Sequence, residues 1–297
     1  MPNPQAPLVS VGIPTYNRVR LLERAIESVL QQDHRNVELV IGDNASTDDT
    51  EAACRALATR DPRVHYIRQP VNRGPTANFN IVLAEARGDF FMWLSDDDWL
   101  DANYLSECLK AMTLQPEASM VAGQCRFYDE HSAFMREDPP TTLAQPTPSE
   151  RVLAYYANVE YNSIFYGVMP TRLVRQTPMQ NALASDWIIV ANMAIHGTVM
   201  TIPTTRVHRT VGAGASRTVK NVVRVAGLPA YQARLARLTV TFNASRALLK
   251  APWPDSTSSF ARARAALLTF FILFVRYSWF RRLIPRRLRT ALANRFA

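Results

Sequence analysis

Regular alternation between strand-like and helix-like segments is the feature that most constrains the fold of this chain. Four short apolar runs have the length and composition of buried strands, at 8–13, 37–41, 64–67 and 90–94. Segments with apolar residues at helical spacing separate them. Four such alternations within about 110 residues predict βαβ units, and therefore a mostly parallel sheet that helices cover on both faces.

The chain from 119 to 216 has a less regular pattern. We expect strands near 120–128, 164–168 and 199–208, and helices near 149–157 and 186–196. We assign these elements to the same domain as the residues before them.

Polar residues follow the carboxyl ends of the first four predicted strands. They are PTYNR at 14–18, DN at 43–44, QPVNRG at 69–74 and the acidic triplet DDD at 96–98. In parallel α/β sheets, ligands bind beyond the carboxyl ends of the strands. We therefore expect these four clusters to line one crevice, which makes the crevice a candidate site.

The acidic triplet itself suggests a bound cation. Three adjacent carboxylates repel one another, and here large apolar Trp and Leu residues flank them in the sequence. No GxGxxG follows the first strand and no GxxxxGK[ST] occurs in the chain, so a dinucleotide site and a P-loop are both disfavoured. Carboxylates in such a crevice suit a nucleotide diphosphate held through Mg²⁺ or Mn²⁺. Taken alone, the triplet is also compatible with a solvated turn.

Four segments now suggest a family. SVGIPTYNR, IGDNASTDDT, NRGPTANFN and WLSDDDWL occur in that order. Together they resemble the family 2 glycosyltransferases, strongly over residues 8–112 and more weakly up to about residue 216. The resemblance implies an α/β GT-A fold, which is a Rossmann-like, mostly parallel sheet flanked by helices. It also implies metal-dependent, inverting transfer of a sugar from a nucleotide-sugar donor to a hydroxyl acceptor.

The same resemblance implies roles for individual residues. The residues matching the nucleotide-binding positions are Pro14, Thr15, Tyr16, Arg18, Asp43, Asn72, Arg73 and Asp96. Asp97 is then the best metal ligand, with Asp98 and His208 as further ligands, and Asp186 is the implied catalytic base. Ser95 stands where the commoner form of the motif has its first carboxylate.

Plainer structural roles compete with three of these assignments. Asp43 is placed to cap a turn with Asn44, and Asp186 is placed to cap the apolar helix that follows it. For His208, the alternative to metal binding is the role of an ordinary structural histidine. Two other functions also remain open for the whole chain: a sugar-nucleotide nucleotidyltransferase and a catalytically inactive, nucleotide-binding partner subunit.

Charge divides the chain near residue 216. Residues 1–216 carry 18 Lys and Arg against 24 Asp and Glu, whereas residues 217–297 carry 16 against the single acid Asp255. We expect a GT-A domain over 1–216 and a basic, amphipathic helical region over 217–297. Such a strongly basic region is suited to anionic partners.

The basic region contains an apolar run, AALLTFFILFV at 265–275. As a helix it would be about 16 Å long, too short to cross a bilayer. Arginines flank it, including those at 281, 282, 286, 287 and 289, so we expect it to lie in an anionic membrane interface. Packing on the GT-A domain or on a second copy of the chain is the alternative. Nucleic acid is disfavoured because no nucleic-acid module is recognisable.

Localisation and partners follow from these features. Three widely spaced cysteines and the lack of a signal-peptide pattern favour a reducing compartment. We therefore expect a cytoplasmic protein that is peripheral on the inner face of the cell membrane. Its expected partners are a nucleotide-sugar donor, Mn²⁺ or Mg²⁺, and a lipid-linked or cell-surface glycan acceptor, with homo-oligomerisation left open.

Overall fold

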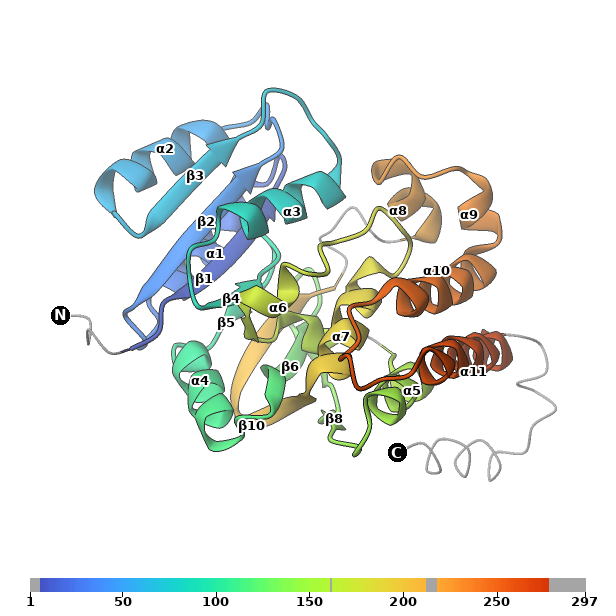
Figure 1. Cartoon of the computed structure of the whole chain (residues 1–297). Coiled ribbons are helices and arrows are strands. Elements are labelled where there is room, and N and C mark those ends of the chain that lie inside the picture. Colours follow the sequence, from blue (N-terminus) through green and yellow to red (C-terminus); the bar gives the residue numbers. More distant parts are fainter. Residues whose placement is uncertain (1–5, 161, 212–217, 278–297) are drawn as a thin grey trace.

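The computed structural model describes residues 6–160, 162–211 and 218–277 (Figure 1). Its first sheet has the strand order β3-β2-β1-β4-β9. The strands are β1 (Val9–Thr15), β2 (Val37–Asp43), β3 (Val64–Arg68), β4 (Phe90–Trp93) and β9 (Met169–Pro170). The first four are parallel to one another and only β9 runs antiparallel, against β4. The predicted mostly parallel sheet is confirmed.

Helices cover this sheet as the apolar spacing predicts. They are α1 (Val19–Leu30), α2 (Thr50–Arg60) and α3 (Pro75–Glu85), whereas α4 (Tyr104–Leu114) packs on β6 (Ala118–Tyr128) and β10 (Thr198–Thr210). In α1, the buried residues Leu22, Ala25, Ile26 and Val29 form one face. Helix α3 packs closely on β1, where a Cβ atom at Gly12 would lie 2.7 Å from Val82 Cγ2. This close approach fixes where the N-terminal end of α3 stands relative to the strand ends.

A second sheet lies beside the acidic triplet. Its strands are β5 (Trp99–Leu100), β6 (Ala118–Tyr128), β7 (Phe134–Glu137), β8 (Thr142–Leu143) and β10 (Thr198–Thr210). The order is β5-β10-β6-β7, with β8 paired to β10. Strand β5 comes directly after the acidic triplet and pairs with Val207 and His208 of β10. The end of β10 is therefore held beside the triplet, although the two are far apart in the sequence.

One predicted strand is wrong. Ser163–Tyr166 forms the 3₁₀ helix η1, and only Val168 bridges to Val121 of β6. The left-handed backbone of Asn162, with φ of 51°, starts a tight turn that buries the consecutive residues of η1. A short run in which every residue is apolar cannot be assigned to strand or helix from periodicity alone.

Three further helices precede the basic region. They are α5 (Pro148–Asn158), α6 (Thr171–Val174) and α7 (Ser185–His196). Thr147 and Glu150 form a reciprocal capping box at the start of α5, which defines where that helix begins. Helix α7 packs against β6, β10 and α5. Its apolar residues lie in the core, and its N-terminal turn carries Asp186.

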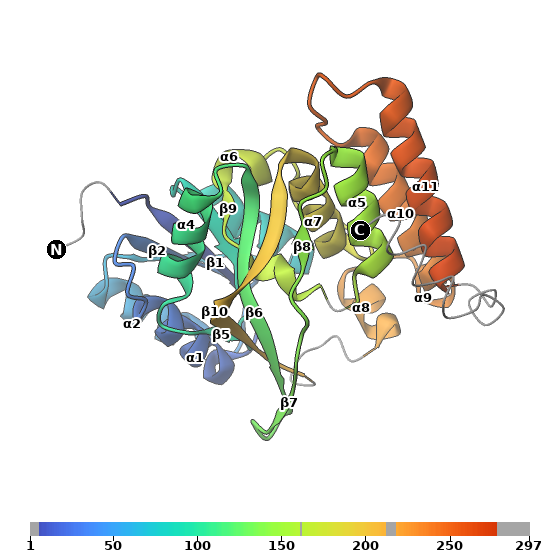
Figure 2. The same ribbon diagram turned by 90° about the horizontal axis from the view of Figure 1, so that it is seen from below.

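The described part of the basic region is helical, as expected. It contains α8 (Val219–Val225), α9 (Tyr231–Arg234), α10 (Ala236–Lys250) and α11 (Ser259–Tyr277). Helices α10 and α11 lie side by side, and α11 also packs on α5 (Figure 2). Arg276 fastens this contact by donating hydrogen bonds to the backbone carbonyls of Tyr156 and Val159. The arginines between 281 and 289 lie outside the described residues.

Within the described ranges, none of the helices is both long and apolar enough to cross a bilayer. In α11 the apolar run is divided between two faces. Ala265, Ala266, Thr269 and Leu273 are buried against neighbouring helices. Leu267 and Phe271, by contrast, are more than half exposed. Packing on α10 and α5 therefore accounts for the buried face of this helix, whereas the other face is exposed.

Candidate active site

The acidic triplet lies where β4 ends, and it is buried. Asp96, Asp97 and Asp98 are 5%, 9% and 2% exposed. Burying charged carboxylates is costly unless hydrogen bonds or opposite charges compensate. A solvated turn would leave these side chains exposed, so that explanation of the triplet does not hold. The cost of burying each of the three carboxylates must therefore be offset by specific neighbours.

Asp96 is bonded to two residues from the end of β1 and the start of α1. Thr15 Oγ1 donates to Asp96 Oδ2 at 2.8 Å, and Arg18 Nη1 lies 2.9 Å from Oδ1. Burial raises the pKa of Asp96 to about 6, although the Arg18 charge opposes the shift. The structure therefore brings together three residues that the resemblance assigned to the nucleotide.

Asp98 is bonded on both of its oxygens. Thr210 N donates to Oδ1 at 3.0 Å, and the Tyr166 hydroxyl donates to Oδ2 at 2.5 Å. Arg209 Nε also lies 3.4 Å from Oδ2. Burial raises the pKa of Asp98 to about 6 against the effect of the Arg209 charge. Its role as a second metal ligand stays a prediction, and it would require Asp98 to exchange one of these bonds.

Asp97 differs from its neighbours. Arg18 Nη1 lies 3.4 Å from Oδ2, whereas Oδ1 has no hydrogen-bond partner in the described part of the chain. Its backbone is held firmly, because Arg24 and Thr210 both donate to the Asp97 carbonyl at 3.1 Å. Asp97 is thus a carboxylate with a fixed backbone, and its Oδ1 is available to a further ligand.

This donor set fits a hard divalent cation. Mg²⁺ is usually held by one or two carboxylates together with phosphate oxygens and water. Across residues 6–160, 162–211 and 218–277, no three His, Cys, Asp or Glu side chains form a ready-made metal cluster. An ion at Asp97 would therefore depend on donor phosphates and water for the rest of its ligands.

The ends of β2 and β3 lie at the same edge of the sheet as the end of β4. Asp43 accepts hydrogen bonds from Ser46 N at 2.8 Å and from the Tyr66 hydroxyl at 2.6 Å. Asp43 therefore has the turn-stabilising role considered above, and its contact with a base or ribose stays a prediction. Pro14 lies in β1 opposite Gly42, at the same edge of the sheet.

Asn44 ties the β3–α3 loop to this edge. Its side chain donates to Asn72 Oδ1 at 2.9 Å and accepts from Arg73 N at 2.8 Å. Among the described residues, the Arg73 guanidinium has no ion-pair partner, and both it and Tyr16 are exposed. The loop is therefore fixed through its backbone, while two side chains assigned to the nucleotide remain accessible.

His208 is already engaged on both ring nitrogens. Nε2 lies 2.8 Å from Asp101 Oδ1, and Nδ1 lies 3.1 Å from the Tyr128 hydroxyl. The ring is also stacked on Trp99, with ring centroids 5.0 Å apart. This geometry gives His208 a structural role. Its predicted role as a metal ligand stays untested and would require one of these bonds to break.

Asp186 lies in the first turn of α7, one residue inside the helix rather than at its cap. Asn162 Nδ2 donates to Asp186 Oδ2 at 2.8 Å, and the Tyr155 hydroxyl in turn donates to Asn162 Oδ1 at 2.6 Å. Burial raises the pKa of Asp186, and the Asn162 hydrogen bond opposes the rise. A carboxylate held in one orientation with a raised pKa has the properties of a general base.

Tyr166 and Arg209 contribute to the site in ways that sequence patterns did not reveal. The Tyr166 hydroxyl contacts both Asp98 Oδ2 and Ser95 Oγ, the latter at 2.8 Å. Ser95 thus provides a neutral partner where a carboxylate would add a fourth negative charge. Arg209 lies over the Tyr166 ring, 5.0 Å from its centroid. A local pattern does not reveal these contacts, because the partners of both residues are distant in the sequence.

Comparison with known proteins identifies the family. The sequence model of "Glycosyl transferase family 2" matches residues 10–181. A Campylobacter jejuni GalNAc(5)-diNAcBac-PP-undecaprenol beta-1,3-glucosyltransferase is 39% identical over 105 residues, which are 35% of this chain and 34% of the relative. A putative colanic acid biosynthesis glycosyl transferase of Escherichia coli, WcaA, is 33% identical over 160 residues, covering 54% of this chain and 56% of the relative.

These matches span about a third to about half of each relative's length. Solved structures match over nearly the whole chain. Staphylococcus aureus TarS 1–349 in complex with UDP-GlcNAc has a TM-score of 0.64 at 14% identity, covering 97% of this chain and 79% of TarS 1–349. A Pyrobaculum calidifontis mannosyltransferase in complex with GDP-Man and Mn²⁺ has a TM-score of 0.53 at 18% identity, covering 99% and 81%. At such identities the likeness shows the fold. The chain therefore has the GT-A fold and belongs to the family 2 glycosyltransferases, a family of transferase enzymes.

Proposed function

We propose that this protein transfers a sugar from a nucleotide-sugar donor to a hydroxyl acceptor, with inversion and with the help of Mn²⁺ or Mg²⁺. The observation that carries the proposal is the buried triplet, in which Asp97 alone keeps a carboxylate oxygen without a hydrogen-bond partner among the described residues. Relatives support it, because two matched structures were solved with a nucleotide sugar and one of these also with Mn²⁺.

Donor binding would use the edge formed by β1, β2 and β4. Asp97 would hold the cation, which when bound neutralises charge on the departing diphosphate. Thr15 and Arg18 orient Asp96, so that its carboxylate is fixed before the donor arrives. Arg73 adds an accessible positive charge at the rim of the crevice.

Acceptor activation would use Asp186. It accepts the proton of the attacking hydroxyl while the oxygen forms a bond to the anomeric carbon of the donor sugar. The bond from that carbon to the diphosphate breaks on the opposite side, and the nucleoside diphosphate leaves with the bonding electrons. Asn162 orients one carboxylate oxygen of Asp186 through a hydrogen bond to Oδ2.

The acceptor that we favour is a lipid-linked or cell-surface glycan. Two relatives support this choice by their names, one of which specifies an undecaprenol-linked substrate and the other colanic acid biosynthesis. The expectation that the protein works at the inner face of the cell membrane is part of the same proposal. Membrane binding by the basic region also belongs to this proposal.

Membrane binding would use one face of α10 and α11, which we call the α10–α11 face. It consists of Phe242, Leu249, Phe260, Leu267 and Phe271, all more than half exposed. Such a patch is uncommon on a protein that meets only water. The surrounding region from 217 to 297 has 16 Lys and Arg and one acid. Apolar residues within a basic region suit an anionic lipid surface.

Release of nucleoside diphosphate tests the enzymatic proposal. Purified protein is supplied with a panel of UDP- and GDP-sugars and with a bacterial lipid extract, in Mn²⁺ and in EDTA. We expect Mn²⁺-dependent release with at least one donor. Binding of a nucleoside diphosphate without any release, across the whole panel, would favour the inactive partner subunit. In a separate assay with UTP or GTP and a sugar 1-phosphate, formation of a nucleotide sugar with release of pyrophosphate would favour the nucleotidyltransferase.

A further inference from the structure

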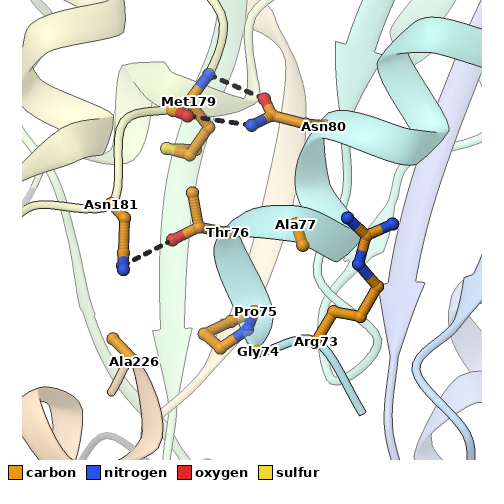
Figure 3. A pocket seen from close by; sticks show the side chains of 9 residues that line it. All are labelled: Arg73, Gly74, Pro75, Thr76, Ala77, Asn80, Met179, Asn181 and Ala226. Carbon is orange, nitrogen blue, oxygen red and sulfur yellow. Dashed lines mark hydrogen bonds between the residues drawn. The ribbon is translucent and has the colours of Figure 1, made fainter. Parts of the chain in front are cut away.

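A pocket of about 340 Å³ lies at the N-terminal end of α3 (Figure 3). Three separate segments line it: the first turns of α3, the loop that carries Met179 and Asn181, and Ala226 just after α8. No residue of the acidic triplet lines this pocket. Ala226 also comes from the basic region, outside the residues that match the family model. The pocket is therefore a feature of its own beside the donor crevice.

Specific hydrogen bonds fix two walls of the pocket relative to one another. The Asn80 side chain pairs with both backbone groups of Met179, at 2.8 Å and 2.9 Å. The Thr76 hydroxyl donates to Asn181 Oδ1 at 3.2 Å. The Asn181 amide nitrogen has no partner among the described residues and remains free to donate. A preformed pocket of this kind is typical of sites for small polar molecules, which have volumes of roughly 300–1,000 Å³.

The position of the pocket indicates which substrate it would meet. Arg73, which we assign to the donor, lies on its rim. On the other side, the loop continues from Asn181 into α7 and reaches Asp186 five residues later. Gln180 N donates to Ser185 Oγ at 2.7 Å, which closes this loop into a compact turn. The pocket thus connects the donor side of the crevice with the segment that carries the proposed base.

We propose that this pocket binds a sugar ring of the acceptor. This inference rests on the function proposed above. Asn181 would donate a hydrogen bond to a sugar hydroxyl group, while Pro75, Met179 and Ala226 offer the apolar surface that the C–H face of a pyranose needs. Because α8 contributes to the pocket, the basic region has a second role in selecting the acceptor.

Substitution at position 226 tests this proposal. Ala226 caps the end of α8 and is partly exposed, so Ala226→Trp fills the pocket without entering the core, and Ala226→Ser is its matched control. Saturation-transfer NMR measures the binding of a panel of methyl pyranosides in the presence of UDP or GDP and Mn²⁺. We expect a saturation-transfer signal, which reports binding, from at least one glycoside with the parent and with Ala226→Ser. This signal should be lost with Ala226→Trp. Asn181→Ala should weaken glycoside binding roughly five- to tenfold, the effect of one lost hydrogen bond.

Calorimetry with UDP, GDP and their sugars separates this inference from the proposed function. We expect equal donor affinity and equal melting temperatures in the parent and both variants at position 226. Weaker nucleotide-sugar binding by Ala226→Trp would assign the pocket to the donor sugar and overturn the inference. The inference also fails if no glycoside binds the parent, or if Ala226→Trp binds glycosides as well as the parent does. If the parent binds no nucleotide at all, it is the proposed function that fails.

Discussion

The acidic triplet and the α10–α11 face depart from the usual distribution of residues in opposite directions. In the triplet, charged side chains are buried, and hydrogen bonds or ion pairs hold each one in place. In the α10–α11 face, large apolar side chains are exposed next to a strongly basic segment. Each departure costs stability in the isolated protein. The comparison indicates that both regions are adapted to ligands, a cation with a diphosphate in one and a lipid surface in the other.

The largest effect is expected at Asp97. We predict that Asp97→Ala abolishes Mn²⁺-dependent binding of a nucleoside diphosphate, because it removes the only triplet carboxylate that has an oxygen without a hydrogen-bond partner in the described part of the chain. The fold should survive, since one of three mutually repelling charges is lost. Calorimetry with and without Mn²⁺ measures the binding. Equal Mn²⁺-dependent affinity in the variant and the parent would remove Asp97 from the site.

The next effect concerns Asp186. Asp186→Asn keeps a side chain that can accept the Asn162 hydrogen bond but removes the basicity. We predict nearly normal donor binding and a transfer rate lowered by about 10²- to 10⁴-fold. Turnover of the parent should fall at low pH with an apparent pKa above the ordinary value of 3.8, because burial raises the pKa of Asp186. Turnover of the variant within a few-fold of the parent would mean that the base lies elsewhere.

Stability provides an independent check on the same residue. A carboxyl group whose pKa is higher in the folded than in the unfolded protein binds its proton more tightly when folded. Its contribution to the free energy of unfolding is present below the unfolded pKa and is lost as pH rises through the folded pKa. We therefore expect Asp186→Asn to melt at the same or a higher temperature than the parent at pH 8, with the difference shrinking at pH 4. A lower melting temperature at pH 8 would contradict the raised pKa.

A smaller effect is expected on the α10–α11 face. Phe271→Ser should weaken binding to vesicles of anionic phospholipid by about tenfold, because an exposed aromatic side chain loses its contact with the lipid. Leu114→Ser on α4, which changes an exposed apolar residue far from the basic region in the sequence, is the matched control. Salt should weaken the binding of the parent. If both variants bind vesicles like the parent, the face is better explained as a contact between copies of the chain.

The smallest effect distinguishes two buried tyrosines. Tyr166→Phe removes the hydrogen bond to Asp98 and should lower the free energy of unfolding by about 1–3 kcal/mol. Tyr156→Phe should be neutral, because the Tyr156 hydroxyl is buried without a partner within the described residues. Urea denaturation of both variants measures the difference. Equal stabilities would show that the triplet does not depend on the Tyr166 bond.

Much of the fold was predictable from the sequence. The strands β1 to β4 were found because short apolar runs with turn residues between them have few alternative structures. The edge of the sheet followed from those strands, so Thr15, Asp43 and Asp96 were expected to lie close together. The strand predicted near 164–168 was wrong, because every residue of η1 is buried and the pattern has no period.

Tertiary structure alone decided how the triplet is stabilised. Asp98 meets Tyr166 across 68 positions of sequence because η1 packs on β6 and β4, and it meets Thr210 across 112 because β10 pairs with β5 and β6. The same pairing gave His208 two partners and so a structural role. It is also the packing of α11 on α10 and α5 that divided its apolar run into a buried and an exposed face. Local sequence determines strands, turns and the placing of acidic residues, because these depend on neighbours in the chain. Hydrogen-bond partners and exposed faces depend on contacts between distant segments, which only the folded chain creates.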